Sequence, residues 1–387
     1  MAPFRLVLRN LMRRPLRSFL TIASITVAIF LIVGLRTLLT TLTAGIEAAD
    51  SRRLAVMSAT GLFVELPMSY QQKIDQVSGV EKTTKFQWFG GYYQSPKNFF
   101  GQFAVDPPAM LAMYPECQLT QEERERFLAN RTSCLVGQDI ARDFGWKIGD
   151  TIPLIGALHP HPDDKAWEFQ VAGVYRSEVP NFDNRTMFFH WEYLEETLKS
   201  GGVPSGVAVF AIRVKPGADV AQVIADVEGL FENGPQRVDC DTEAEFQRQF
   251  VSMVGNLPLF VGWIGTGVLI AIGLACINTM LMAMREQVSE IGILKSLGFT
   301  DGSMFGLLIA QALALCCIGG GLGLALAWAT EGPISRGLGM MFPGYAIRAE
   351  TFLLAGGLAV GLGLVAGVVP AWNAARLRVV EALRSVE

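Results

Sequence analysis

Histidines and clustered carboxylates are the first residues in this sequence to consider for chemistry. Two of the three histidines lie in the segment 159–164, which reads His-Pro-His-Pro-Asp-Asp and has the residue types of a metal site. Histidines at positions i and i+2 beside two aspartates do not match the ligand spacing of a typical metal centre. The two prolines indicate an exposed loop. We therefore expect a solvated loop here and no bound metal.

The other polar residues give no stronger sign of catalysis. His190 stands between Phe189 and Trp191, and we interpret it as a half-buried residue at the end of a strand. The carboxylate pairs at 122–123 and 195–196 fall on polar helix faces, where we expect them to be solvated. The sequence contains no G-x-x-x-x-G-K-[ST], H-E-x-x-H, G-x-S-x-G or paired C-x-x-C motif. We therefore predict that the chain is not an enzyme and binds no cofactor of its own.

The six cysteines give no basis for predicting a disulfide framework. Three of them lie in apolar stretches, where a thiol acts as a small packing residue: Cys276, Cys316 and Cys317. The other three lie in a more polar region that we place outside the cell: Cys117, Cys134 and Cys240. Because three is an odd number, these cysteines cannot all pair with one another. A bridge between Cys117 and Cys134 stays an open alternative.

The segment 285–298, R-E-Q-V-S-E-I-G-I-L-K-S-L-G, has the pattern of a short amphipathic helix. Its apolar residues recur at helical spacing, with charged residues between them. The apolar positions are Val288, Ile291, Leu294 and Leu297. One interpretation is a helix on the membrane surface that joins two spans. The other is a helix whose apolar residues dock into a groove on a cytoplasmic protein.

Four long apolar stretches of the sequence are expected to form the helices that position the segment 285–298. A helix over Phe19–Leu42, where Arg36 is the one charged residue, would be ~36 Å long and would cross a hydrocarbon core of ~30 Å. A cleaved signal peptide is the alternative, but this run exceeds the usual apolar region and no clear A-x-A site follows it. Three further stretches without charge are Leu257–Met284, Met304–Thr330 and Thr351–Trp372. Apart from Arg36, the four stretches contain no Asp, Glu, Lys, Arg or His. This lack of titratable groups at membrane depth argues against proton-coupled transport.

The sequence therefore divides into four spans with the segments between them. We expect a cytoplasmic basic segment at 1–18, a first span with stalk at 19–43, an extracytoplasmic domain at 44–256, a second span at 257–284, a cytoplasmic loop at 285–303, a third span at 304–330, an outer loop at 331–350, a fourth span at 351–372 and a cytoplasmic tail at 373–387.

The positive charges set the expected orientation. The net charge is −4, which excludes an obvious nucleic-acid-binding protein. Basic residues are in excess outside 44–256, and acidic residues are in excess within it. The first eighteen residues carry five arginines and no acid: Arg5, Arg9, Arg13, Arg14 and Arg17. This bias places both termini in the cytoplasm, because four spans return the chain to its starting side.

The region 44–256 alternates short strands with amphipathic helices, which predicts an α+β domain. The expected strands are Leu62–Leu66, Phe99–Val105, Thr151–Ile155, Phe169–Tyr175 and Val207–Val214. The expected helices are Ser69–Val77, Gln121–Ala129, Gln138–Phe144 and Asp219–Phe231. A last helical pattern, Asp241–Gly255, leads into the second span and predicts a continuous stalk. The predicted fold is thus an integral membrane protein with four transmembrane α-helices and a large α+β extracytoplasmic domain inserted between helices 1 and 2.

The segment 285–298 resembles the signature loop of FtsX-like and MacB-like ABC transporter permeases, a superfamily that includes LolC/LolE-type permeases. That signature is close to R-x-x-E-I-G-[IV]-L-[KR]-A-[LM]-G. The C-terminal run P-A-W-N-A-A-R-L at 370–377, followed by E-A-L-R at 381–384, also resembles the family's ending, although Val379 replaces a common proline. Segments 135–141, 149–152 and 169–174 are similar to the family's periplasmic core, and the resemblance covers essentially the whole chain.

The resemblance implies a permease that lacks its own ATPase domain and binds a separate cytoplasmic ABC ATPase, which holds ATP and Mg. The residues that would couple to the ATPase are Glu286, Glu290, Ile291, Gly292, Leu294, Lys295, Leu297 and Gly298. A second permease chain, identical or paralogous, would complete the transmembrane unit, and membrane lipid and a periplasmic adaptor protein are further expected partners. The expected location is the bacterial inner membrane. Glycine pairs at G-x-x-x-G spacing would allow close helix packing: Gly319/Gly323, Gly357/Gly361 and Gly363/Gly367.

Two functions follow from this resemblance. In the first, ATP-driven movement of the stalks and the outer domain expels a hydrophobic substrate from the outer side, which is called mechanotransmission. The substrate would be a lipoprotein, a lipid, a drug or a peptide. In the second, an FtsX-like regulator transports nothing and couples cytoplasmic ATP hydrolysis to an envelope hydrolase or sensor. The size of the outer domain favours the first function.

Overall fold

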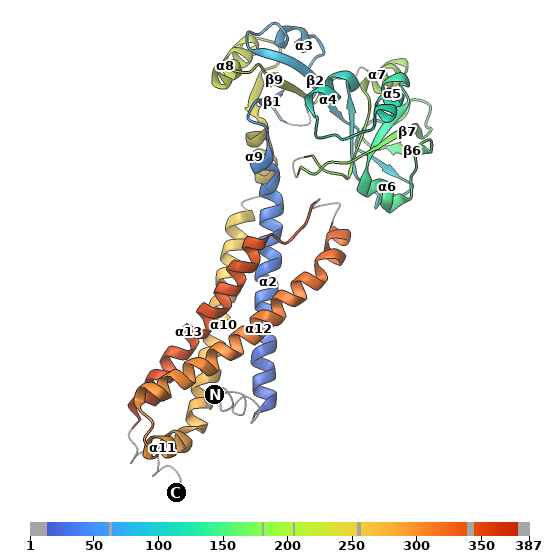
Figure 1. The fold of residues 1–387 in the computed structure, drawn as a ribbon. Coiled ribbons are helices and arrows are strands. Elements are labelled where there is room, and N and C mark those ends of the chain that lie inside the picture. Colours follow the sequence, from blue (N-terminus) through green and yellow to red (C-terminus); the bar gives the residue numbers. More distant parts are fainter. Residues whose placement is uncertain are drawn as a thin grey trace. The chain divides into compact units, whose positions relative to one another are not determined.

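The computed structural model describes residues 14–61, 64–179, 182–203, 206–253, 257–338 and 344–377. The chain forms two compact units, divided near residues 40 and 256. One consists of helices and is called the helical unit below; the other is called the α+β unit. Figure 1 shows the elements of both.

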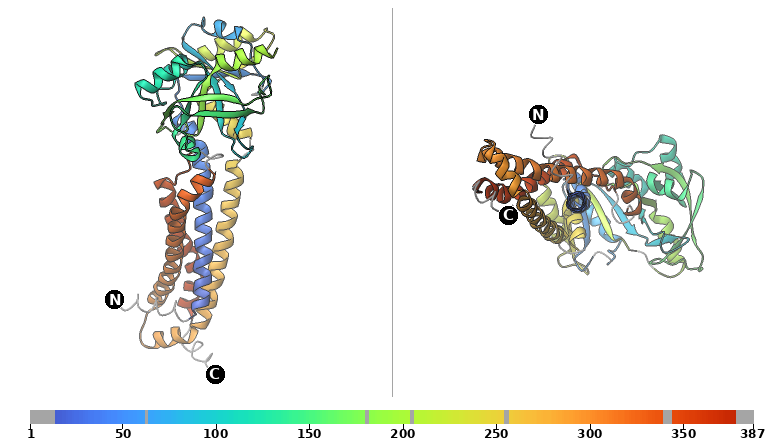
Figure 2. Two further views of the ribbon diagram at one scale, coloured as in Figure 1. Left: turned by 90° about the vertical axis from the view of Figure 1, so that its right-hand side faces the viewer. Right: turned by 90° about the horizontal axis from the view of Figure 1, so that it is seen from below.

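Within the part of the chain that the structure describes, the helical unit contains four long helices and one short helix. They are α2 Pro15–Ala48, whose last turns belong to the α+β unit, α10 Leu257–Glu286, α11 Val288–Ser296, α12 Asp301–Leu338 and α13 Ala349–Arg376. Within the described residues, α2, α10, α12 and α13 are long and apolar enough to cross a membrane. The four predicted spans are therefore confirmed, and Figure 2 shows α2 and α10 running side by side.

Two of the three glycine pairs bring helices of the helical unit close together. A methyl group on Gly319 would lie 2.8 Å from Ile25 Cβ, and one on Gly323 would lie 2.7 Å from the Thr26 carbonyl oxygen of α2. Gly363 and Gly367 of α13 face α12 in the same way. Gly357 and Gly361 have nothing within 4 Å of that position. The G-x-x-x-G spacing thus marks close packing within the chain at two of the three predicted places.

The α+β unit is built on one ten-stranded sheet with the order β10-β1-β9-β2-β4-β8-β5-β7-β6-β3. The strands are β1 Arg53–Ser58, β2 Val80–Trp88, β3 Gly91–Tyr93, β4 Gly101–Val105, β5 Ser133–Gly137, β6 Thr151–Gly156, β7 Trp167–Tyr175, β8 Thr186–His190, β9 Val209–Val214 and β10 Val238–Thr242. The β4–β8 and β5–β7 pairs are parallel and the other pairs are antiparallel. The helices are α3 Ser69–Ile74, α4 Pro107–Met113, α5 Gln121–Ala129, α6 Gln138–Phe144, α7 Trp191–Ser200, α8 Val220–Phe231 and α9 Glu243–Met253.

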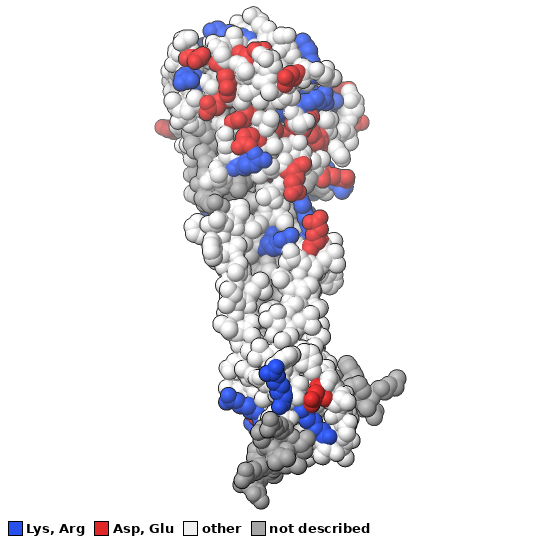
Figure 3. All heavy atoms as spheres, turned by 90° about the vertical axis from the view of Figure 1, so that its left-hand side faces the viewer, with Lys and Arg blue, Asp and Glu red and all other residues white. Residues whose placement is uncertain are grey.

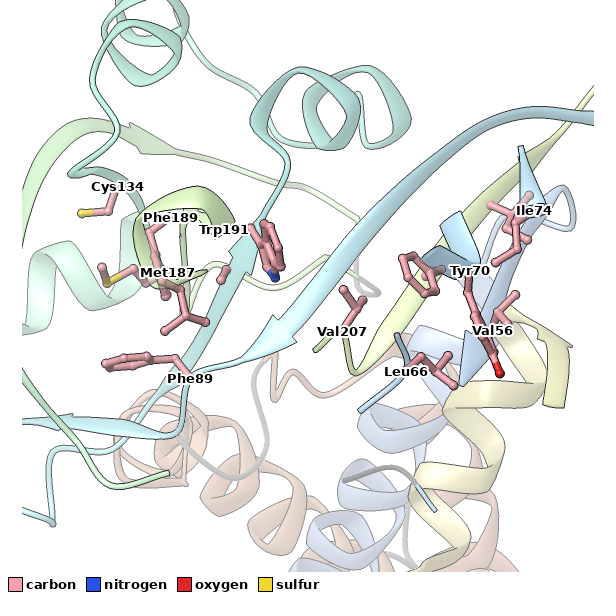
Figure 4. Close-up of a cluster of buried hydrophobic side chains, with 14 of the residues drawn as sticks. Val56, Leu66, Tyr70, Ile74, Phe89, Cys134, Met187, Phe189, Trp191 and Val207 are labelled. Atoms are coloured by element: carbon pink, nitrogen blue, oxygen red, sulfur yellow. The ribbon is translucent and has the colours of Figure 1, made fainter. Parts of the chain in front are cut away.

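A continuous apolar core holds this sheet and its helices together. It extends from Val56 of β1, Leu66 and Tyr70 to Phe89 and to Phe189 of β8 (Figure 4). Phe89 is fully buried and meets three other aromatic rings edge to face, with ring centres 5.4 to 5.9 Å apart: Trp167, Phe169 and Phe189. Such edge-to-face contacts add to the free energy gained by burying the rings.

Most of the predicted elements of the α+β unit are confirmed. Helices α5 and α6 have the predicted bounds, and β4, β6, β7 and β9 lie within two residues of the predicted strands. Residues 62–63 of the expected strand Leu62–Leu66 lie outside the described residues, and Leu66 forms an isolated bridge with Val207. The other strands were missed. β1 and β5 are buried at every position, so their sequences lack the alternation that indicates a strand.

The predicted helix Asp241–Gly255 begins two residues late in the structure. Asp241 and Thr242 belong to β10, where they pair with Ala55 and Leu54 of β1, so α9 starts at Glu243. The predicted continuity of this segment with the second span falls on residues 254–256, which lie outside the described residues. The continuous stalk therefore stays a prediction.

Candidate functional site

The histidine loop is more buried than its sequence indicated. His161 is 9% exposed and packs edge to face on Trp167, so the expectation of a fully solvated loop was wrong at this residue. The Asp163 backbone N–H donates to His161 Nδ1 at 3.2 Å, and burial lowers the pKa of the imidazole. Among the described residues, no group of three His, Cys, Asp or Glu side chains could hold a metal ion.

Two further polar residues are more buried than expected, since we expected His190 to be half-buried and Glu123 to be solvated. His190 is 6% exposed, and its Nε2 lies 2.6 Å from the Phe127 carbonyl oxygen. Glu123 caps α5: its carboxylate accepts from the Thr120 N–H at 2.9 Å, while its own N–H donates to the Thr120 hydroxyl. The second carboxylate oxygen accepts from the Val174 N–H at 3.1 Å. These contacts explain both residues as structural.

All six cysteines are free thiols in this structure, so the bridge left open between Cys117 and Cys134 is not present. Both side chains are buried in the α+β unit. Burial raises the pKa of the Cys117 thiol to about 12. A thiol with so high a pKa is almost entirely protonated at neutral pH and is a poor nucleophile.

The segment 285–298 contains a short helix, as predicted: α11 spans Val288–Ser296. The preceding helix α10 ends at Glu286, and Gln287 separates the two. Gly298 ends α11 with φ +96°, a left-handed conformation that favours glycine. Its N–H donates to the Lys295 carbonyl, and the Phe299 N–H donates to the Leu294 carbonyl, each at 3.1 Å. This pair of bonds is a Schellman motif, which stops the helix sharply.

One face of α11 packs on its own chain. Ile291 is 3% exposed and clusters with four buried residues of α12 and α13: Met304, Leu308, Ala371 and Ala374. Gly292 is buried, and Leu294 packs on the edge of the same cluster. Two of the expected docking residues, Ile291 and Leu294, therefore face the helical unit in this structure.

Lys295 also binds within the chain. Its side chain is 7% exposed, and Nζ lies 2.7 Å from Asp301 Oδ1. Nζ donates to the Ala375 and Leu377 carbonyl oxygens at 2.8 and 2.9 Å, at the C-terminal end of α13. A cation placed there satisfies carbonyls that the helix leaves open. Lys295 thus joins α11 to α12 and α13.

Glu286 joins the end of α10 to the start of α2. Its carboxylate lies 2.5 Å from Arg17 NH2, in a two-pronged ion pair, and 3.4 Å from Arg14 Nε. Glu290 lies half-buried in the first turn of α11. Of the charged residues predicted to meet a partner, Glu286 and Lys295 therefore have strong contacts with other helices of the unit.

The opposite face of α11 is apolar and exposed. Ile293 is 50% exposed and Leu297 is 72% exposed, one helical turn apart, and Phe299 beyond the Schellman motif is 46% exposed. We call these three residues the outward face of α11. Leu297 belongs to the set of residues predicted to couple to the ATPase, whereas Ile293 and Phe299 do not. Because α11 carries apolar residues on both sides, the sequence pattern alone could not tell which side faces outward.

Charged residues of the helical unit lie towards its ends and leave the middle of the helices nearly free of charge (Figure 3). The end that carries α11 has several arginines: Arg14, Arg17, Arg285 and Arg376. This distribution is typical of a protein that crosses a membrane. The fold and the charges together define a multi-pass membrane protein with an α+β unit between its first and second spans.

Comparison with protein families identifies the class more closely. Residues 18–230 match the MacB-like periplasmic core domain, and residues 262–379, which contain α11, match the FtsX-like permease C-terminal domain. The chain belongs to the MacB/FtsX-like family of ABC transporter permeases. The predicted family and fold class are thereby confirmed.

The chain is similar to an uncharacterized ABC transporter permease of Methanocaldococcus jannaschii, with 23% identity over 97% of this chain and 96% of that protein. It is also similar to the macrolide export ATP-binding/permease protein MacB of Neisseria gonorrhoeae, with 23% identity over 55% of this chain and 33% of the relative. The MacB of Psychrobacter cryohalolentis is 34% identical over 34% of this chain and 20% of the relative. This chain therefore spans a third or less of the length of these two MacB relatives.

Two solved structures are similar to parts of this chain. The periplasmic region of MacB from Actinobacillus actinomycetemcomitans aligns with a TM-score of 0.38 and 12% identity, covering 53% of this chain and 95% of that structure. The extracellular domain of the noncanonic ABC-type transporter YknZ from Gram-positive bacteria aligns with a TM-score of 0.36 and 8% identity, covering 49% of this chain and 98% of that structure.

Proposed function

We propose that this chain is the transmembrane subunit of an ABC transporter and that a separate cytoplasmic ATPase, which holds ATP and Mg, docks on the outward face of α11. The observation that carries the proposal is the two-sided character of α11. Ile293, Leu297 and Phe299 offer an exposed apolar surface, while Ile291 and Lys295 fix the helix to α12 and α13. An exposed apolar helix face that lies in a groove of a partner is a common mode of protein recognition.

Because one side of α11 is fixed to α12 and α13, a partner that docks on the other side would be mechanically coupled to these two spans. A partner that moves a loosely attached helix moves that helix alone, whereas α11 is joined to two spans by a buried cluster and by the three contacts of Lys295. Packed protein interiors transmit displacement because they are hardly compressible. A displacement of α11 would therefore reach α12 and α13. In this proposal the movement continues to the α+β unit and expels a substrate by mechanotransmission.

The substrate class and the assembly are parts of the same proposal. Relatives named for macrolide export support a hydrophobic substrate, and lipoproteins, lipids, drugs and peptides all fit this description. The proposed orientation places both termini and α11 in the cytoplasm and the α+β unit outside, because arginines gather at the α11 end. A second permease chain completes the proposed transporter, with a periplasmic adaptor as a further partner.

The proposal is tested by purifying the tagged full-length chain from its native membranes in mild detergent. We expect an ATPase with a Walker motif to co-purify and to hydrolyse ATP. Leu297→Asp and Glu290→Lys should both reduce its recovery, while the amount of permease in the membrane stays unchanged.

Thr300→Asp is the matched control, because it adds a negative charge to the same connection. Thr300 Oγ1 accepts from the Ser303 N–H at the start of α12, a capping role that aspartate also fulfils. Normal ATPase recovery with Leu297→Asp would contradict docking on the outward face. Recovery of an envelope hydrolase, without ATP-dependent substrate movement, would favour the regulatory function instead.

A further inference from the structure

A polar cavity opens between α2, α10 and α12 at the end of the helical unit that carries α11. Its volume is about 320 Å³, and seven polar side chains line it, four of them outside the ion pairs of Glu286: Ser18, Thr279, Gln287 and Gln311. The other three are Arg14, Arg17 and Glu286. Hydroxyls, amides and guanidinium groups in one cavity are suited to a charged, oxygen-rich ligand.

An apolar groove continues from this cavity along α2 and α10. Its volume is about 360 Å³, and it shares Arg17 and Thr279 with the polar cavity. The rest of its lining is largely apolar: Leu16, Leu20, Ile272, Ala275 and Cys276. Leu16 and Leu20 are 72% and 56% exposed, so the groove is open to the side, where a hydrocarbon chain could enter. The two hollows together have the polarity of an amphiphile, with a charged end and an apolar end.

The polar cavity carries a net positive charge. Two arginines line it against one carboxylate, and Arg17 donates two hydrogen bonds to Glu286, at 3.0 and 2.5 Å. A guanidinium has five N–H donors, so Arg17 retains donors after this pairing. The Arg14 side chain is 65% exposed and makes one contact with Glu286, at 3.4 Å. Arginine donors binding a phosphate make strong, charge-assisted hydrogen bonds.

Gln311 gives independent support for a ligand. The residue is 4% exposed, yet its Oε1 is buried and accepts no hydrogen bond from any described residue. A buried polar atom without a partner costs about 1–3 kcal/mol, so natural structures rarely leave one. A headgroup hydroxyl or ammonium bound in the cavity would supply the missing donor.

We propose that this composite site binds one anionic phospholipid. Its phosphate lies between Arg14 and Arg17, its polar headgroup reaches Gln311, and one acyl chain occupies the apolar groove. A free phosphate would leave the groove unused, and a neutral amphiphile would leave the positive charge unmatched. Basic pockets between transmembrane helices bind anionic headgroups in just this way. The lipid would hold the start of α2 against the end of α10, directly before α11.

The test is native mass spectrometry of the purified full-length chain in detergent, with phosphatidylglycerol and phosphatidylcholine added at equal concentration. We expect phosphatidylglycerol to be retained preferentially. The double variant Arg14→Gln/Arg17→Gln should weaken its retention about tenfold or more. Arg285→Gln is the matched control, since Arg285 is an exposed arginine at the same end that does not line either hollow. It should retain the lipid as the wild type does.

A second variant tests the acyl-chain part without touching the charges. Ala275→Phe fills the groove and should also weaken phosphatidylglycerol retention, while leaving competition by inorganic phosphate unchanged. Equal retention of both lipids, or wild-type retention by Arg14→Gln/Arg17→Gln, would overturn the proposal. Complete displacement of the lipid by inorganic phosphate would overturn it too, because the site would then bind phosphate alone. None of these readouts requires an ATPase, so the lipid site and the docking surface are tested separately.

Discussion

Arg53 Nε lies 2.8 Å from Glu243 Oε2, and this ion pair joins the first strand of the α+β unit to its last helix. Arg53 also lies 2.8 Å from Glu116 Oε1, and its guanidinium stacks over the Tyr114 ring at 4.6 Å. The Asp50 N–H donates to the same Glu243 carboxylate at 3.2 Å. Arg53 is 1% exposed, so this cluster fixes the place where α2 leads into the unit and where α9 leaves it.

Removing the arginine should be costly. Arg53→Met leaves the largely buried carboxylates of Glu116 and Glu243, whose side chains are 17% and 14% exposed, without their guanidinium partner. Breaking a buried ion pair in this way typically costs about 3–5 kcal/mol of folding free energy. Pulse proteolysis of the full-length chain in urea, following the α+β unit, measures the loss. Arg131→Met is the control, because Arg131 pairs with Glu192 and Glu196 on the surface and should cost less than about 1 kcal/mol. Equal losses in the two variants would show that the buried cluster has no special role.

Glu123 should make the stability of the α+β unit depend on pH. Burial acts to raise the pKa of this carboxyl, but hydrogen bonds from the Thr120 and Val174 N–H groups and the Thr120 hydroxyl outweigh it, so the pKa lies below the usual 4.5. The native state therefore holds this proton less tightly than the unfolded chain does. The stabilisation is complete above about pH 4.5 and is lost as pH falls through the lower native pKa.

Urea unfolding followed by the fluorescence of buried tryptophans measures this dependence. The stability difference between the wild type and Glu123→Gln should shrink as pH falls from neutral to below 4.5. Glu122→Gln removes one negative charge from the exposed neighbouring position and serves as the control. A difference between the wild type and Glu123→Gln that stays constant with pH would mean that the ionised carboxylate does not stabilise the cap.

The helical unit should tolerate a methyl group at one glycine and resist it at another. Gly319→Ala places Cβ 2.8 Å from Ile25 Cβ, which is a steric clash between two carbon atoms. It should lower the free energy of unfolding of the helical unit by about 1–3 kcal/mol. Gly357→Ala meets nothing within 4 Å and should be neutral or slightly stabilising, since alanine favours helix more than glycine does. Thermal unfolding of the full-length chain in detergent compares the two. A neutral Gly319→Ala would contradict close packing of α2 on α12.

Lys295 should hold the end of α13 in place. Lys295→Met removes the donor to the Ala375 and Leu377 carbonyls while keeping most of the apolar stem. We expect faster amide hydrogen exchange in the last turn of α13 and little change in the middle of that helix. Ser296→Ala, at the exposed neighbouring position of α11, should leave the exchange unchanged. Unaltered exchange with Lys295→Met would show that its contacts do not stabilise the helix end.

Much of the fold could be predicted from the sequence because strong local signals were present. The four spans follow from long stretches with almost no charge. Thr120 caps the start of helix α5, with Glu123 three residues later, which is a capping-box signature. Gly145, whose φ is +72°, caps the end of α6. The missed strands β1 and β5 lie under other elements on both faces, so burial removed the alternating pattern on which strand prediction depends.

The candidate site was harder to predict than the helix that carries it. The apolar positions of α11 surround the helix, and contacts with α12 and α13 decide that Ile291 faces inward while Leu297 faces outward. The role of Lys295 likewise depends on the end of α13, where Ala375 lies 80 residues further along the chain. The burial of Glu123 and His161 was missed for the same reason, because tertiary packing overrides the local polarity of a segment.

The central claim is that the outward face of α11 contacts an ATPase, and photo-crosslinking tests it directly. A photoreactive amino acid placed at Leu297 in the full-length chain, activated in native membranes, should form a covalent product with a Walker-motif ATPase. The same amino acid at Leu353, which is 78% exposed on α13, should not. A crosslink from Leu297 to lipid alone, with no protein product in membranes that contain the ATPase, would contradict the account and leave α11 as a membrane-surface helix.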